Sequence, residues 1–189
     1  TAYEISLGLV GSEMCIRDRY CTKDVDRFGG YNIDMAQQQE ELCFTVCVFQ
    51  DAEWASRGLA ALTENGFSTD RLSLVAQRTD DIDALLEKTF GVGKVQASVE
   101  IAGLGDVVAH GPLVGALQGS DNALNRGGMA ATMRRAGFQD HDGFIFETLT
   151  GRGGVLVATE GEMRAADALA LFHSYGGGNA AIGAWRGRV

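Results

Sequence analysis

The chain has 189 residues, with 16 basic and 25 acidic side chains and a net charge of −9 at pH 7. Phosphate backbones and anionic lipid surfaces repel such a chain, so the charge argues against a nucleic-acid partner and against membrane contact. No stretch approaches the roughly 18 to 20 apolar residues that a membrane span requires.

The first feature in chain order is "GLVGSEMCIRDR", Gly8–Arg19, which has no apolar period and no cap signal. It lacks the basic and apolar regions of a secretory signal and is too acidic for a mitochondrial presequence. Its residues resemble the translation of an adapter used in transposon-based sequencing libraries. We therefore predict that residues 1–34 are a non-native or disordered leader and that the domain starts at Met35. A short native extension from Tyr20 is the alternative.

Residues 35–189 hold 12 basic and 19 acidic residues, a net charge of about −7. This length suits one domain with its own hydrophobic core. Cys43 and Cys47 lie four apart in an apparent strand, about 13 Å from each other along one face. That distance excludes a disulfide between them, so we expect two small apolar side chains and a reduced, cytoplasmic compartment.

The first predicted unit is β-α-β. "ELCFTVCVFQD" alternates between two apolar faces, which is typical of a central strand. Asp51 is a suitable N-cap for the amphipathic helix that follows, and Gly66 is suited to end that helix. "RLSLVAQ" is then a second strand.

The C-terminal part repeats this pattern as "GGVLVATE", "GEMRAADALALFHSYGG" and "NAAIGAW". The two helices align at an offset of 110 residues, and Val46 and Val48 match Val155 and Val157 at an offset of 109. Such a repeat predicts an α+β fold, a ferredoxin-like split β-α-β sandwich. In that topology both helices cover one face of the sheet, and the other face is open.

A helical Gly-rich insertion separates the two halves, at about 79–152. It begins with a predicted helix, "DDIDALLEKTF", capped by Asp80 or Asp81. A Gly-punctuated segment follows, then a helix that ends at Gly137 and a shorter helix in "QDHDGFIFETLTGRG".

Four segments carry a family resemblance: "FQDAEWASRGLAALTENGF", "GLGDVVAHGPLVGALQG", "MRRAGFQDHDGFIFETLTGRGGVLVAT" and the closing β-α-β unit. Together they resemble the bacterial general stress protein domain of the YflT or 17M type. The similarity extends over Phe44 to Trp185. It implies an association with stress but carries no agreed reaction and no catalytic residues.

"GLGDVVAHG" is superficially similar to a dinucleotide-binding loop. Val108 stands where the third glycine belongs, so no nucleotide and no other cofactor is expected. The three histidines, His110, His141 and His173, are isolated in the sequence, so no metal site is predicted. No residue is assigned a catalytic role.

The leading hypothesis is a non-enzymatic, stress-associated cytoplasmic domain that acts through self-association as a homodimer or higher homo-oligomer. It is motivated by the two apolar faces of the first strand. The alternative is a module that binds a small ligand or stress signal in a pocket between the Gly-rich insertion and the sheet. Its predicted ligand-binding residues are Gly103, Gly105, His110 and Gly111.

Overall fold

The computed structural model describes residues 43–91, 99–161 and 163–178. The chain divides into two units, Thr1–Gln39 and Glu40–Val189, and every described residue belongs to the second. The predictions for the leader at 1–34 and for a last strand in "NAAIGAW" fall outside the described residues.

The described part of the chain has an α+β fold built on one antiparallel sheet, in the strand order β1-β5-β2-β4-β3. The strands are β1 (Phe44–Phe49), β2 (Leu72–Gln77), β3 (Val99–Ile101), β4 (Gly105–His110) and β5 (Val155–Glu160). On the side of β1 away from β5, Val48 forms an antiparallel bridge with Gly178, with N···O distances of 2.7 and 2.9 Å. Among the described strands β1 lies at the edge of the sheet, and this single bridge is its only described pairing on that side.

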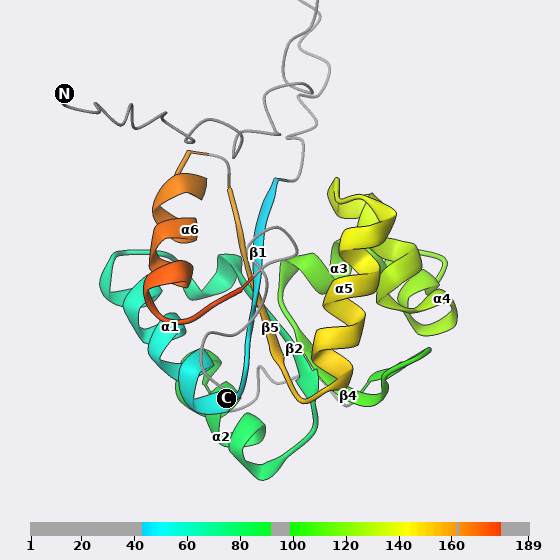
Figure 1. Cartoon of the computed structure of the whole chain (residues 1–189), viewed down its shortest axis with the longest axis horizontal. Helices are drawn as coiled ribbons and strands as arrows, with labels where there is room; N and C mark the ends of the chain where they lie inside the picture. The colour runs from blue at the N-terminus through cyan, green and yellow to red at the C-terminus, as the bar shows by residue number, and fades with distance from the viewer. Residues whose placement is uncertain (1–42, 92–98, 162, 179–189) are drawn as a thin grey trace, which may run out of the picture. The chain divides into compact units, whose positions relative to one another are not determined.

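Helices cover both faces of this sheet (Figure 1). One layer contains α1 (Ala52–Glu64), α2 (Asp80–Phe90) and α6 (Ala165–Ser174). The opposite layer contains α3 (Pro112–Gln118), α4 (Ala123–Thr132) and α5 (Asp140–Gly151). Two short 3-10 helices are η1 (Thr69–Arg71) and η2 (Met133–Ala136).

Each sheet face has its own hydrophobic core. In β1, Val46 and Val48 pack into the core under α3, α4 and α5, whereas Cys47 and Phe49 pack into the core under α1, α2 and α6. The expectation of an open sheet face is therefore wrong. The face that was expected to be open is as apolar as the opposite one. It is covered by α3, α4 and α5, which lie between β2 and β5 in the chain.

The internal repeat needs a correction in its strands. Val46 and Val48 face the α3–α5 layer, but their matched residues Val155 and Val157 face the α1, α2 and α6 layer. A shift of one residue moves a strand side chain to the other face, so an offset of 109 residues does not preserve the face. The helical part agrees better, since Gly66 and Gly176 both adopt a φ of +81° just after their helices.

The first two helices start at caps that differ in how well they were predicted. Asp51 caps α1 as expected, its carboxylate accepting a hydrogen bond from Trp54 N at 3.0 Å. For α2 the N-cap is Thr79, whose hydroxyl accepts from Ile82 N at 3.3 Å, and not Asp80 or Asp81. The two aspartates lie in the first turn, where their charge still suits the helix dipole.

The Gly-punctuated segment has more structure than its sequence indicates. Its described residues form the β3–β4 hairpin and α3. The helix that ends at Gly137 consists of two pieces, because Gly128 has a φ of 77° and a ψ of 178°, which interrupts α4. Gly137 itself has a φ of +81°, as a helix-ending glycine should.

Candidate functional site

The β3–β4 hairpin turns at Gly103. Leu104 N donates to Ile101 O at 3.0 Å across the turn, and Gly103 has a φ of +88°. A four-residue turn with positive φ at its third position is a type II turn, which requires glycine there. This segment joins two antiparallel strands, whereas a dinucleotide loop joins a strand to a helix, so the resemblance to such a loop is only in its letters.

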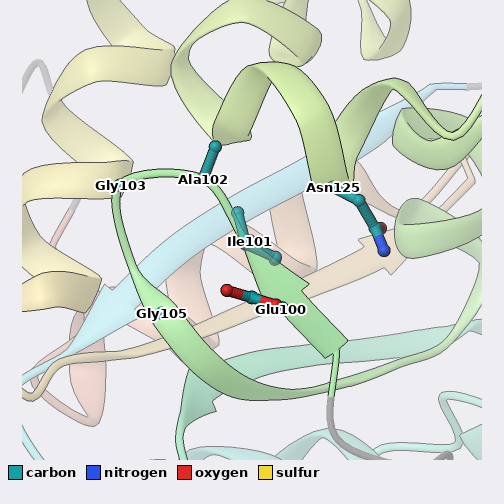
Figure 2. Close-up of a pocket in the computed structure, with 6 residues that line it drawn as sticks. All are labelled: Glu100, Ile101, Ala102, Gly103, Gly105 and Asn125. Carbon is teal, nitrogen blue, oxygen red and sulfur yellow. The ribbon is translucent and has the colours of Figure 1, made fainter.

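A groove of about 350 Å³ lies beside this turn. Its lining is formed by Glu100, Ile101, Ala102, Gly103, Gly105 and Asn125. Figure 2 shows the Glu100 side chain on β3, inside the curve of the hairpin, and Asn125 on the neighbouring helix. Two of the four residues predicted from the sequence therefore line one groove, together with a carboxylate and an amide.

The wall of the groove is set by a contact between the hairpin and α4. Ala102 N donates to the backbone oxygen of Asn125 at 3.2 Å. Further along α4, a Cβ at Gly128 would lie only 2.6 Å from Ala102 O. The hairpin turn and α4 consequently approach each other at a distance that only glycine permits at the kink.

Glu147 of α5 reaches this same point. Its Oε2 atom accepts a hydrogen bond from Ala130 N at 2.8 Å. A Cβ at Gly103 would lie 2.7 Å from Glu147 Oε1, and one at Gly128 would lie 2.8 Å from Oε2. The half-buried carboxylate is therefore enclosed by the hairpin turn on one side and by the kink of α4 on the other.

His110 and Gly111 lie at the opposite end of β4. Five residues separate Gly105 from His110 along the strand, which is about 17 Å. The half-buried His110 ring packs against Phe90, with 4.3 Å between ring centroids and 51° between planes. The structure thus separates the predicted residues into two pairs, Gly103 with Gly105 and His110 with Gly111, and no single pocket holds all four.

Gly111 has a clear structural requirement of its own. Its φ is +97°, and a Cβ there would clash with the Leu72 carbonyl oxygen and lie 2.6 Å from Ser73 Cα. Beside it, the buried Ser73 hydroxyl accepts a hydrogen bond from Leu113 N at 2.9 Å. The glycine lets the start of α3 approach β2 closely, so its place in the fold is explained without a ligand.

The remaining candidates have structural surroundings. Cys43 and Cys47 are both free thiols, and burial raises the pKa of the Cys47 thiol well above its ordinary value. His141 lies in the first turn of α5, with its Nε2 atom 3.3 Å from Asp142 Oδ1, and His173 lies in the last turn of α6. Both histidines therefore lie at helix ends.

The described residues contain neither a metal-binding cluster nor a membrane-spanning helix. Within these residues, no three His, Cys, Asp or Glu side chains are grouped so that they could hold a metal ion. No helix in the same ranges is both long and apolar enough to cross a membrane.

Sequence reasoning missed three side chains that shape these two places. Glu147 and Asn125 meet the hairpin through folding alone, and nothing in their local sequence marks them. Ser73 did carry a signal, because a hydroxyl in the apolar strand "LSLVAQ" must find a partner when the strand is buried.

Comparison of the chain with protein-family models, with curated proteins and with solved structures gave no match.

Proposed function

We propose that this chain is a non-enzymatic binding module whose binding site is the groove beside the β3–β4 hairpin. The observation that carries the proposal is the lining of the groove, which includes Gly103 and Gly105, two of the residues that the sequence marks for ligand contact. The ligand is a small molecule, since the volume is about 350 Å³.

The polar groups at the groove favour a ligand that donates hydrogen bonds. Glu100 lines the groove, and Asp106 stands directly opposite it in the hairpin register. Both side chains are exposed, and like charges at directly opposed positions destabilise a strand pair. A small cation relieves that repulsion, and carboxylates accept hydrogen bonds without donating any. The exposed Ala102 adds apolar contact, so we propose a small organic amine or guanidine.

The non-enzymatic part of the proposal is supported by the surroundings of the reactive groups. Cys47 is buried in the core under α1, α2 and α6, and its raised pKa keeps the thiol protonated and unreactive. The His110 ring packs against Phe90 in a tilted arrangement, and His141 is beside Asp142 at a helix start. Each group has a structural position, away from the groove lining.

A thermal-shift titration with agmatine and putrescine tests the binding proposal. At ten times its Kd, a ligand should raise the melting temperature by about 4 °C. Glu100→Gln should abolish the shift, because it removes the charge that lines the groove. Glu87→Gln is the matched control, since Glu87 is exposed on α2, in the layer that covers the opposite sheet face.

His110→Ala separates this proposal from one in which all four predicted residues share a ligand. It should leave the amine-induced shift unchanged, because His110 lies about 17 Å from the hairpin turn. A shift that survives Glu100→Gln but disappears with His110→Ala would contradict the groove assignment. No shift with either amine at 10 mM would reject the amine class.

Self-association is the second candidate, and an exposed aromatic side chain on α5 favours it. Phe144 is 64% exposed, whereas Phe146 on the same helix is buried in the core. Because helices cover both sheet faces, the contact surface that we propose is α5 and not the sheet. Sedimentation velocity of the full chain at high micromolar concentration should show a homodimer that Phe144→Ser dissociates. A wild-type monomer would reject this candidate.

The finer fold assignment is also a proposal, that of a ferredoxin-like split β-α-β sandwich with a Gly-rich insertion. It is supported by β5, which lies between β1 and β2 and is antiparallel to both. The Val48–Gly178 bridge supports a fourth strand beside β1. An experimental structure without a strand along that edge after Gly178 would contradict it.

Stress association and cytoplasmic location rest on the family resemblance of the sequence and on the free thiols Cys43 and Cys47. They predict that the protein accumulates in the cytoplasm after heat or osmotic shock. Quantitative immunoblotting of cell fractions measures this, and an unchanged level would remove the stress proposal.

A further inference from the structure

The kink in α4 creates a second helix start inside that helix. Gly128, with its extended ψ of 178°, precedes a new helical segment that runs from Met129 through η2. A glycine has no side chain with which to cap that start, and the amide of Ala130 is one of the groups left without an intrahelical partner. Glu147 supplies the missing acceptor from another helix, at 2.8 Å.

The same carboxylate also contacts the groove-forming turn. Its Oε1 atom lies 2.7 Å from the position that a Cβ atom at Gly103 would occupy, so a side chain at Gly103 would collide with it. No ion pair to Glu147 occurs among the described residues, so the charge is compensated by the N–H group and by the positive end of the new helical segment. One residue therefore joins α5, the α4 kink and the hairpin turn.

We propose that Glu147 is a latch that holds the groove in its conformation. It fixes the second half of α4 by capping it, and it keeps the hairpin turn against the kink. Asn125 and Ala102, which line the groove and share a backbone hydrogen bond, are positioned through this contact. Releasing the carboxylate leaves the turn joined to α4 by the Ala102–Asn125 hydrogen bond, weakens that bond by removing its support, and changes the width of the groove. This role does not depend on whether the groove binds a ligand.

Hydrogen exchange of the full-length chain, followed amide by amide, tests the latch. Glu147→Ala should lower protection of the Ala102 and Ala130 amides by about tenfold. The reason is that the wild-type protein must break the carboxylate contact in order to open locally, and the variant has no such contact to break. The Val48 amide, bonded to Gly178 O in β1, should keep its protection. Glu147→Gln retains an acceptor oxygen, so protection of the Ala102 and Ala130 amides should fall less than in Glu147→Ala. Glu64→Gln on α1 is the control for a lost surface charge.

Two results would overturn the proposal. If protection at Ala102 is unchanged in Glu147→Ala while Ala130 alone loses it, Glu147 is only a cap for α4 and the hairpin is not coupled to it. If Ala102, Ala130 and Val48 lose protection equally in Glu147→Gln, the residue supports global stability and is no latch. Glu147→Gln decides the question where Glu147→Ala does not fold.

Discussion

The two helical layers of this fold are held in different ways. On one face, α1 and α2 begin at side chains next to them in sequence, Asp51 and Thr79. On the other face, α3 and the second half of α4 begin at glycines, Gly111 and Gly128. Both glycines combine a positive φ with a ψ of 178°, and in each case the amide of the second residue of the new helix donates to a side chain from another element.

The two tertiary caps are Ser73 from β2 and Glu147 from α5. A third long-range contact in this layer joins Arg135 of η2 to Asp121 through two hydrogen bonds of 2.8 and 2.7 Å. The difference teaches that the starts of α1 and α2 are specified by local sequence, whereas the starts of α3 and of the second half of α4 depend on contacts that exist only once the chain has folded. It concerns these four helix starts, since α5 in the second layer has a local capping box of Gln139 and Asp142. Substitutions of single capping residues should therefore show this difference in the free energy of unfolding more clearly than truncations of core side chains.

The largest expected effect is at Gly111. Gly111→Ala places a side chain at positive φ and against the backbone of β2, so it should lower the free energy of unfolding by about 3 kcal/mol. Gly137→Ala is the control, because Gly137 also has a positive φ but no heavy atom within 4 Å of an added Cβ. Gly137→Ala should lower the free energy of unfolding by only about 1 kcal/mol. Urea denaturation measures both, and equal losses would show that the close approach to β2 is not limiting.

A comparison of the two kinds of cap should give a smaller effect. Ser73→Ala leaves the buried Leu113 amide without its acceptor and should cost about 2 kcal/mol. Asp51→Ala removes a local cap at a half-exposed helix start and should cost about 1 kcal/mol. The same urea series measures both. A smaller loss for Ser73→Ala than for Asp51→Ala would contradict the distinction between the layers.

The smallest effect concerns the surface pair of Asp121 and Arg135. The hydrogen bonds from Arg135 lower the pKa of Asp121 from 3.8 to about 2. Because the folded-state pKa is depressed, the stabilisation from this pair is present above pH 3.8 and is lost as the pH falls towards 2. Carboxyl NMR titration should give this low pKa in the wild type and a value nearer 3.8 in Arg135→Gln.

Arg134→Gln is the control for this titration, since Arg134 is close to Asp140, at 3.5 Å, and not to Asp121. It should leave the Asp121 pKa low. A wild-type Asp121 that titrates near 3.8 would show that the contact with Arg135 does not stabilise this layer.

Sequence reasoning succeeded where structure depends on neighbours in the chain. The Asp51 cap and the positive φ at Gly66 are local properties, so α1 could be predicted together with both of its ends. The three-residue strand β3 has too little sequence for a period, and the pairing of strands across the sheet has no local signature. The coverage of the second sheet face was missed for that reason.

Two of the four ligand-binding residues predicted from the sequence line the groove. Gly103 and Gly105 were identifiable because closely spaced glycines mark a turn or a close approach. Glu147 was not, because its contacts with Gly103 and Ala130 join residues that are distant in the sequence. His110 was grouped with the glycines by proximity in sequence, but a strand places its two ends far apart in space.

The position of β5 has a consequence for how this protein is made. Neither β1 nor β2 pairs with the other, and both use β5, which follows β1 by more than 100 residues. On a ribosome that adds about 5 to 20 residues per second, both early strands wait several seconds for their shared partner. During that time β1 has two apolar faces and two open edges. Its assembly depends on late, long-range closure, which slows folding and leaves apolar strand surface uncovered while the chain is incomplete.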